Sequence, residues 1–228
     1  MNNKYPGVFI TVEGPDGSGK STLVAAMTEW LKSRNLPFIQ TKEPGTPLNP
    51  VCQKIRSLVL DPNNDIDEHA EIYLMLADRC QHVAKVIRPA LAEGKIVISD
   101  RYIDSTYAYQ GWGRRFGNRE DLEYIDYLNE KTTNGLVPDL TFLIMVDPLV
   151  GLQRATKSEF GTADRMEKEK IDFHQRLCNG YMDLYEHSGE ERKFRLIDTT
   201  NKNAGQCKEE ILAHLYFYLR AEHGIFNI

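Results

Sequence analysis

A short glycine-rich stretch constrains this chain more than any other feature. It reads G-x-x-x-x-G-K-S and consists of Gly14-Pro15-Asp16-Gly17-Ser18-Gly19-Lys20-Ser21-Thr22. An apolar run at 8–12 precedes it and a helical pattern starting at Leu23 follows it, so we expect a strand, a tight turn and a helix. In that context backbone N–H groups turn toward phosphate oxygens and the positive end of the helix faces them. We therefore predict a phosphate-binding loop in which Lys20 reaches the β and γ oxygens of a nucleotide and Ser21 holds Mg²⁺.

The charge balance and the lack of long apolar runs exclude some classes of function. The 228 residues carry 28 Lys and Arg against 33 Asp and Glu, a net charge of −5, without a long basic run. Proteins that bind duplex nucleic acid need concentrated positive charge, so we expect no nucleic-acid partner. No apolar run reaches about 18 residues, so we also expect no membrane span.

The cysteines and the first residues indicate a cytoplasmic protein. Cys52, Cys80, Cys178 and Cys207 are scattered without a C-x-x-C pair, which is typical of thiols that stay reduced. Residues 1–6 lead directly into the first apolar run and do not resemble a signal peptide. The length suits a single domain over 1–228 with small inserted flaps.

Apolar runs and helical patterns alternate along the chain. We predict strands at 8–13, 38–41, 96–99, 140–146 and 194–197, and helices at 20–34, 48–60, 67–92, 119–133, 148–157, up to about 187, and at 204–222. Right-handed crossovers then give an α/β fold, a five-stranded parallel sheet with helices on both faces, and ligands bind at the carboxyl ends of its strands. The predicted core stripe of the longest helix is Ile72, Leu76, Cys80, Val83, Ile87 and Leu91.

Several polar residues fall at or beside this sheet edge. Asp100 and Arg101 follow the third strand directly, where they could orient the waters of Mg²⁺ and grip a phosphate, or form a structural ion pair. The next ten residues, 102–111, offer hydroxyls, an amide and aromatic rings, which suit either a pocket for a base and sugar or a packed helix. Arg79 is offset from the core stripe, which favours solvent over a pocket edge.

A charged stretch at 154–170 could include a lid. Its cations are interleaved with acids, so most of it is expected to face solvent, while one or two cations close over a transferring phosphate. The lid is placed at about 154–168, and its candidate catalytic cations are Arg154, Lys157 and Arg165.

Five segments together resemble the thymidylate kinase family of nucleoside monophosphate kinases. They are 13–22, then 42–47 with Lys42-Glu43-Pro44-Gly45-Thr46-Pro47, then Ala77-Asp78-Arg79, then 99–111, and finally 138–141 with 164–167. The first segment is generic to P-loop proteins. The segment from Asp100 to Gly111 is specific to the family, and the resemblance runs nearly end to end. It implies the P-loop NTPase fold, ATP as donor, a thymidine monophosphate as acceptor, Mg²⁺ as cofactor and a homodimer.

The resemblance also implies roles for single residues. ATP lies on residues 14–22, with Lys20 and Arg101 as catalytic cations and Ser21 and Asp100 at the metal. The implied acceptor site consists of Asp16, Glu43, Arg56, Met75, Arg79, Arg101, Ser105, Thr106, Tyr109 and Gln110. Within it, Asp16 contacts the 3′-hydroxyl of the sugar, and Tyr109 crowds the 2′ position and so favours deoxyribose. Either Ser105 or Thr106 contacts the base together with Gln110.

Three positions distinguish this chain within the family. Gly17 stands where one branch has a basic residue, so the chain resembles the bacterial branch, in which the lid supplies the catalytic cation. Met75 replaces the usual phenylalanine that stacks on the base, and a thioether is more adaptable than a ring. Trp112 is expected to place a large ring beside the pocket. Met75 and Trp112 together raise the hypothesis of a modified or broader set of pyrimidine deoxynucleotides as acceptors.

The expected reaction transfers the γ-phosphoryl group of ATP to dTMP and yields ADP and dTDP. This transfer needs no protein nucleophile, because the acceptor phosphate is already anionic. One alternative is a deoxynucleoside kinase, which needs a general base such as Glu43 or Asp16. Another is a P-loop protein that senses a nucleotide without turnover.

Overall fold

The sheet arranges the chain so that its chemistry-bearing residues meet at one edge. The computed structural model describes residues 5–114, 119–156, 165–166, 169–189 and 192–225. Within them the strands are β1 (Val8–Glu13), β2 (Phe38–Lys42), β3 (Ile96–Asp100), β4 (Leu140–Met145) and β5 (Phe194–Asp198). All pairs are parallel, in the order β2-β3-β1-β4-β5. The predicted α/β class and each predicted strand are confirmed.

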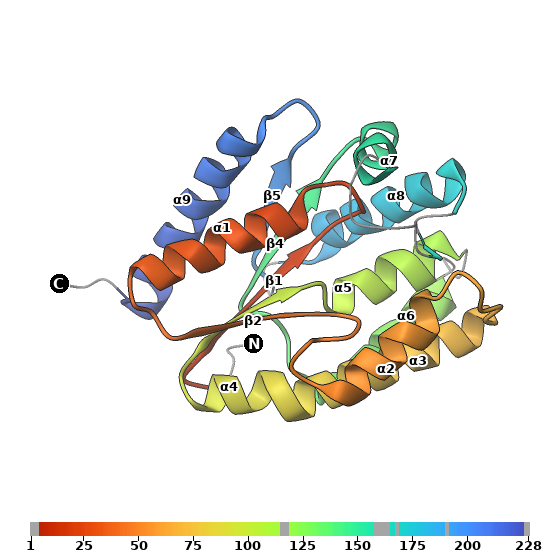
Figure 1. Ribbon diagram of the computed structural model, residues 1–228, viewed down its shortest axis with the longest axis horizontal. Coiled ribbons are helices and arrows are strands. Elements are labelled where there is room, and N and C mark those ends of the chain that lie inside the picture. The colour runs from red at the N-terminus through yellow and green to blue at the C-terminus, as the bar shows by residue number, and fades with distance from the viewer. Residues whose placement is uncertain (1–4, 115–118, 157–164, 167–168, 190–191, 226–228) are drawn as a thin grey trace.

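Helices cover both faces of the sheet (Figure 1). They are α1 (Lys20–Ser33), α2 (Pro50–Leu60), α3 (Glu68–His82), η1 (Val83–Ile87), α4 (Arg88–Ala92), α5 (Ile103–Thr106), η2 (Tyr107–Gly113), α6 (Arg119–Thr133), α7 (Pro148–Thr156), α8 (Ile171–His187) and α9 (Ala204–His223). On one face α1 and α9 bury their apolar sides against β1, β3 and β4. On the other face, η1 and α4 pack on Phe9 and Val97, and α8 packs on η2 and β4. Because β1 is the central strand of the sheet, its side chains are buried on both faces.

The long helical stretch after β2 differs from its predicted side-chain pattern. It runs through α3, η1 and α4, and η1 is a π-helical turn within it. The expected core residue Cys80 is exposed, whereas Asp78, Arg79 and His82 are buried. The apolar-stripe pattern assumes one buried face, but α3 packs against both α2 and α6, so its polar side is covered as well. Among the described helices, none is long and apolar enough to cross a membrane.

Parallel register brings three strand ends together. Asp100 of β3 is paired with Val12 of β1 on one side and with Lys42 of β2 on the other. Glu13 ends β1 one residue later. The glycine-rich turn and the segment that begins with Arg101 therefore leave the sheet at the same edge, where ligands of open α/β sheets bind.

Candidate active site at the carboxyl edge of the sheet

The glycine-rich turn is fixed by close contacts with two other elements. Gly14 has φ 139°, and a Cβ there would lie 2.0 Å from the carbonyl oxygen of Ile144 in β4. Gly17 has φ 73°, and a Cβ there would lie 2.0 Å from the carbonyl oxygen of Gly151 in α7. Only glycine combines this backbone conformation with so close an approach. The turn leads into α1, whose N-cap, Gly19, has no side chain to satisfy the first N–H groups, as an anion site requires.

Lys20 lies folded over this turn. Its Nζ donates to the carbonyl oxygen of Pro15 at 2.7 Å and lies 4.0 Å from Oδ1 of Asp16. Burial, with a smaller contribution from Arg101, lowers the pKa of Lys20 to about 8, although nearby carboxylates oppose the shift. A polyanionic donor would replace the carbonyl as a partner and favour the charged amine.

Ser21 and Asp100 fit a magnesium site. Ser21 Oγ donates to Oδ2 of Asp100 at 3.2 Å. The other oxygen of Asp100, Oδ1, is buried and has no hydrogen-bond partner among the described residues. Mg²⁺ prefers oxygen ligands and is usually held by one or two carboxylates with substrate phosphates and water. A hydroxyl and a partly unpartnered carboxylate at the phosphate-binding turn supply these atoms.

Arg101 connects the turn to the segment after β3. Its guanidinium donates to the carbonyl oxygen of Gly14 at 2.9 Å, to Asp16 at 2.5 Å and to the hydroxyl of Tyr109 at 2.8 Å. The residue has φ 74°, a left-handed conformation that is unfavourable for a side chain with a Cβ. Such strain is found at functional sites, where the surrounding contacts enforce it.

Asp16 is held ionised in this cluster. Burial would raise the pKa of its carboxyl, but Arg101 and Lys20 outweigh burial and, with the hydrogen bond from Tyr109, lower the pKa to about 2. Glu13 behaves in the opposite way. Burial, and next the charge of Asp104, raise its pKa to about 7. The pKa values of Asp16 and Glu13, which are close in sequence, are thus shifted in opposite directions.

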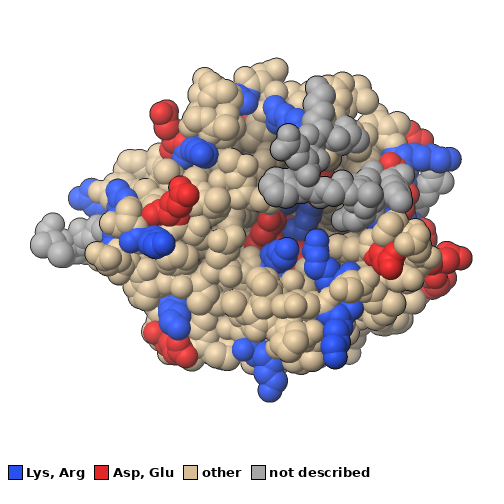
Figure 2. All heavy atoms as spheres, viewed as in Figure 1, with Lys and Arg blue, Asp and Glu red and all other residues tan. Residues whose placement is uncertain are grey.

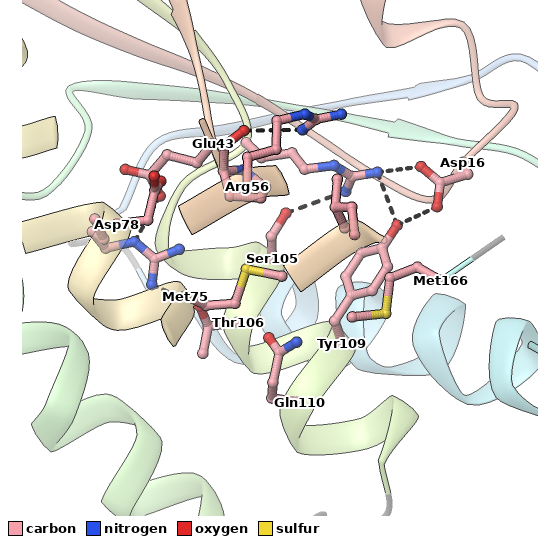
Figure 3. A pocket seen from close by; sticks show the side chains of 14 residues that line it. Asp16, Glu43, Arg56, Met75, Asp78, Ser105, Thr106, Tyr109, Gln110 and Met166 are labelled. Atoms are coloured by element: carbon pink, nitrogen blue, oxygen red, sulfur yellow. Dashed lines mark hydrogen bonds and ion pairs between the residues drawn. The ribbon is translucent and has the colours of Figure 1, made fainter. Parts of the chain in front are cut away.

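The ten side chains expected at the acceptor site all line one cavity (Figure 3). Four lining residues were not expected there: Pro44, Leu60, Asp78 and Met166. A second cavity contains Gly17, Gly19, Lys20, Ser21, Thr22 and Asp100 together with Lys42 and Arg154. Asp16, Glu43, Arg56 and Arg101 line both cavities. Figure 2 shows Lys and Arg side chains gathered around the central hollow.

A third cavity extends the second one toward β5 and α9. It shares Gly17, Gly19, Thr22 and Arg154 with the second cavity and is also lined by Thr199, Lys202, Asn203 and Cys207. Neither this wall nor Lys42 was among the site residues expected from the sequence. Lys42 is the last residue of β2, at the strand edge where ligands bind, so its position could have predicted a role in the site. The lining residues after β5 belong to no motif that could have predicted theirs.

Arg79 lines the acceptor cavity, and its side chain is buried and does not extend to solvent. It donates to Glu43, Thr106, Asn129 and the carbonyl oxygen of Tyr102 at 2.6–2.8 Å. Four of its five N–H groups therefore have partners among the described residues, and one remains for a ligand. The solvent-facing interpretation from the helical pattern is wrong, because α6 and the segment after β3 cover this side of α3.

The structure separates Ser105 from Thr106. Ser105 lines the cavity, but its Oγ donates to Glu13 at 2.6 Å and accepts from Arg101 at 3.2 Å, so its hydroxyl proton is already engaged. Thr106 accepts from Arg79, and its own hydroxyl proton remains available for a ligand. Gln110 donates to Glu71, a buried carboxylate of α3.

The lid residues and Trp112 lie in different places. Arg154 lines the second and third cavities and donates to Thr199 and to the carbonyl oxygen of Thr200. Arg165 donates to the carbonyl oxygen of Val59 and to Glu71, away from the four shared residues. Lys157 lies outside the described residues. Trp112 packs against Gly180 of α8 and is not among the lining residues of the acceptor cavity.

The fold and the paired cavities define a P-loop phosphotransferase with a separate site for an anionic acceptor. The thymidylate kinase family model matches residues 12–211. A thymidylate kinase of Carboxydothermus hydrogenoformans is 43% identical over 218 residues, which cover 96% of this chain and 99% of that protein. Another, from Halothermothrix orenii, is 41% identical over 211 residues, 92% of this chain and 95% of that protein. The chain therefore belongs to the thymidylate kinase family.

A solved structure agrees with this assignment. The crystal structure of a thymidylate kinase from Ehrlichia chaffeensis superimposes with a TM-score of 0.71 at 30% identity. The match covers 92% of this chain and 98% of that one. The predicted P-loop fold and the resemblance to bacterial relatives are confirmed.

Proposed function

We propose that this protein transfers the γ-phosphoryl group of ATP to dTMP, yielding ADP and dTDP. One observation carries the proposal: Asp16, Glu43, Arg56 and Arg101 line both cavities, so a donor and an anionic acceptor would meet between two guanidinium groups. Phosphoryl transfer depends on position and charge cancellation more than on covalent chemistry. A cationic junction between two anion sites supplies both.

Each group then has a defined task. The turn at 14–22 and Lys20 hold the donor phosphates, and Arg56 and Arg101 orient the acceptor phosphate. Ser21 and Asp100 would hold Mg²⁺, which would supply positive charge beside the donor phosphates. Arg154 stabilises the donor from the wall of its cavity. The lid expected at 154–168, most of which lies outside the described residues, would exclude water in the single domain. Tyr109 is held by Asp16 and Arg101, in a position to crowd the 2′ carbon of the sugar.

The contacts of two carboxylates disfavour a deoxynucleoside kinase. That reaction needs a free general base beside a sugar hydroxyl. Glu43 accepts from Arg79 and hydrogen-bonds to His82, while Asp16 accepts from Arg101 and Tyr109. Among the described residues, both candidate bases are therefore already engaged with donors. The two cations that line both cavities, Arg56 and Arg101, also suit a charged acceptor better than a neutral one.

The apolar side of the acceptor cavity supports a pyrimidine acceptor and would accept some variation in the substituents of the ring. Met75 and Met166 line it together with Leu60. Thioethers adapt to different ring substituents. The part of the broad-acceptor hypothesis that depended on Trp112 has no support from the cavity, whereas the part that depends on Met75 remains a proposal.

A coupled ADP assay tests the function. With ATP and Mg²⁺ present, we expect rapid ADP formation with dTMP, much slower formation with other monophosphates and none with thymidine. ADP formation with thymidine alone would favour the nucleoside kinase, and binding of ATP without turnover on any acceptor would favour a nucleotide sensor. We further propose that the enzyme acts in the cytoplasm as a homodimer, without a nucleic-acid partner.

A further inference from the structure

Glu71 is a completely buried carboxylate directly behind the acceptor cavity. It is on α3, and it does not itself line the cavity. Its Oε1 accepts from Nε2 of Gln110 at 2.8 Å. Its Oε2 accepts from Nη2 of Arg114 at 3.0 Å and also from Arg165. Nε of Arg114 also donates to Oε1, at 3.4 Å, so two guanidinium groups hold the carboxylate rigidly while Oε1 accepts from Gln110 as well.

This arrangement fixes which end of the Gln110 amide faces the cavity. An ionised carboxylate only accepts hydrogen bonds, so the NH₂ group of Gln110 must face Glu71. Among the described residues none donates to Oε1 of Gln110, and this oxygen is not one of the sealed polar atoms. Gln110 lines the cavity and points into it (Figure 3). Its carbonyl oxygen is therefore the atom offered to a ligand.

The cavity then presents a donor and an acceptor at its base end. Arg79 lines the cavity and keeps one N–H without a partner among the described residues, which we assign as the donor. The acceptor is Oε1 of Gln110. The imide edge of thymine or uracil offers the complementary pair, a carbonyl oxygen at C4 and an N–H at N3. Cytosine offers the reverse pattern, an amino group at C4 and a lone pair at N3, and would leave buried polar groups unpaired.

We propose that Glu71 is a positioning residue for base selection: it locks the Gln110 amide so that the site reads an imide and rejects an aminopyrimidine. This inference rests on the proposed function. It assigns to α3 a role in specificity without any contact between Glu71 and the substrate. If the lock is removed, the amide can rotate by 180° and offer its NH₂ group to N3 of a cytosine ring.

The test compares two acceptors that differ only at this edge. dTMP and 5-methyl-dCMP share the methyl group, the sugar and the phosphate. For the unaltered enzyme we expect kcat/KM to favour dTMP by at least about 100-fold, as is typical of a site built to pair with a polar edge. In Glu71→Gln the side chain can donate or accept, so we expect this ratio to fall at least tenfold, mainly through a lower KM for 5-methyl-dCMP.

Arg114→Gln is the matched control. It removes a guanidinium from the same carboxylate but leaves the bond between Glu71 and Gln110, so the ratio should stay within about twofold of the unaltered enzyme. Glu71→Gln leaves buried guanidinium groups unpaired and could unfold the protein. The double variant Glu71→Gln/Arg114→Gln removes both members of one pair and is the milder change. Thermal melting identifies the folded variants.

The results separate this inference from the proposed function. An unchanged ratio in a folded Glu71→Gln or double variant overturns the inference, as does an equal fall in Arg114→Gln, because either result makes Glu71 merely structural. A fall in the ratio confined to variants that lack Glu71 supports it. If the unaltered enzyme phosphorylates no nucleoside monophosphate, the proposed function itself fails, whatever the variants do.

Discussion

Lys20 and Arg101 are both proposed catalytic cations, but Arg101 makes many more contacts with the rest of the protein than Lys20 does. Lys20 has one hydrogen bond, to a backbone carbonyl, among its described contacts. Arg101 contacts Gly14, Asp16, Ser105, Tyr109 and Tyr181. Alanine at Arg101 would leave Asp16 without its guanidinium partner, and because this pair is only partly buried we expect a loss of stability below the about 3–5 kcal/mol that is typical of a fully buried pair.

Replacement of Lys20 by alanine should therefore separate activity from folding. We expect kcat to fall about 100- to 1,000-fold, because a charge aimed at the transferring group is lost, while the melting temperature changes little. The coupled ADP assay and thermal melting measure the two effects. A variant with nearly normal turnover would remove Lys20 from the proposed mechanism.

The lowered pKa of Lys20 predicts proton uptake on ATP binding. Without a donor this pKa is about 8, so the amine is charged below pH 8 and increasingly neutral above it. Phosphates favour the charged form, so ATP should bind with uptake of up to one proton near pH 9 and with almost none near pH 6.5. Apparent affinity should fall as pH rises through 8. Calorimetry in buffers of different ionisation enthalpy measures the uptake, and Lys20→Met should abolish it.

At the scale of elements, short segments position the site more than the long helices do. The turn between β1 and α1 packs against α7 through Gly17. The π-helical segment η2 carries Tyr109 and Gln110, and π-helical turns are frequent at functional sites. η2 is buried between α6 and α8, and the turn is held by close contacts with β4 and α7, so packing sets the backbone geometry of both segments.

Two glycines of the turn should fail in different ways when changed to alanine. Gly17 and Gly19 both have positive φ, but a Cβ on Gly17 would collide with the backbone of α7, whereas a Cβ on Gly19 meets nothing within 4 Å. We expect Gly17→Ala to destabilise the fold by several kcal/mol and Gly19→Ala by about 1 kcal/mol. Gly19→Ala should instead lose affinity for ATP, because its methyl group stands at the donor cavity.

Urea unfolding and ATP titration distinguish these outcomes. Equal stability of the two variants would show that the contact between the turn and α7 contributes little to the fold. Unchanged ATP affinity in Gly19→Ala would mean that the donor phosphates do not approach this residue.

For the whole molecule, the proposed homodimer has a suitable surface on α2, α3 and α6. These helices pack on one another and expose apolar side chains: Val51, Leu58, Tyr73, Tyr124 and Tyr127. They lie together at one side of the molecule, apart from α9 (Figure 1). The hydroxyls of Tyr73 and Tyr124 lie 3.3 Å apart, and exposed apolar side chains gathered on packed helices are typical of a protein interface.

Charges on this patch should produce a monomer. We expect Tyr73→Glu/Tyr124→Glu to shift the mass measured by light scattering from dimer to monomer, because two buried carboxylates would face their symmetry-related copies. Phe217→Glu on α9, where the side chain is 64% exposed, is the control and should leave the mass unchanged. A dimer that survives the double change and dissociates with the control would place the interface on α9.

The fold class and most residues that line the acceptor cavity could be predicted from the sequence, and the catalytic and binding roles of those residues stay predictions. The phosphate-binding turn, the alternation of strands and helices and the residues after β3 are local patterns, and local spacing encodes them directly. Tertiary structure decided the burial of Arg79, the exposure of Cys80, the separate roles of Ser105 and Thr106, and the link between Glu71, Gln110 and Arg165. Arg165 reaches Glu71 across 94 positions of the chain. Contacts of this kind depend on which helix covers which polar face, and no periodicity within one segment can specify that.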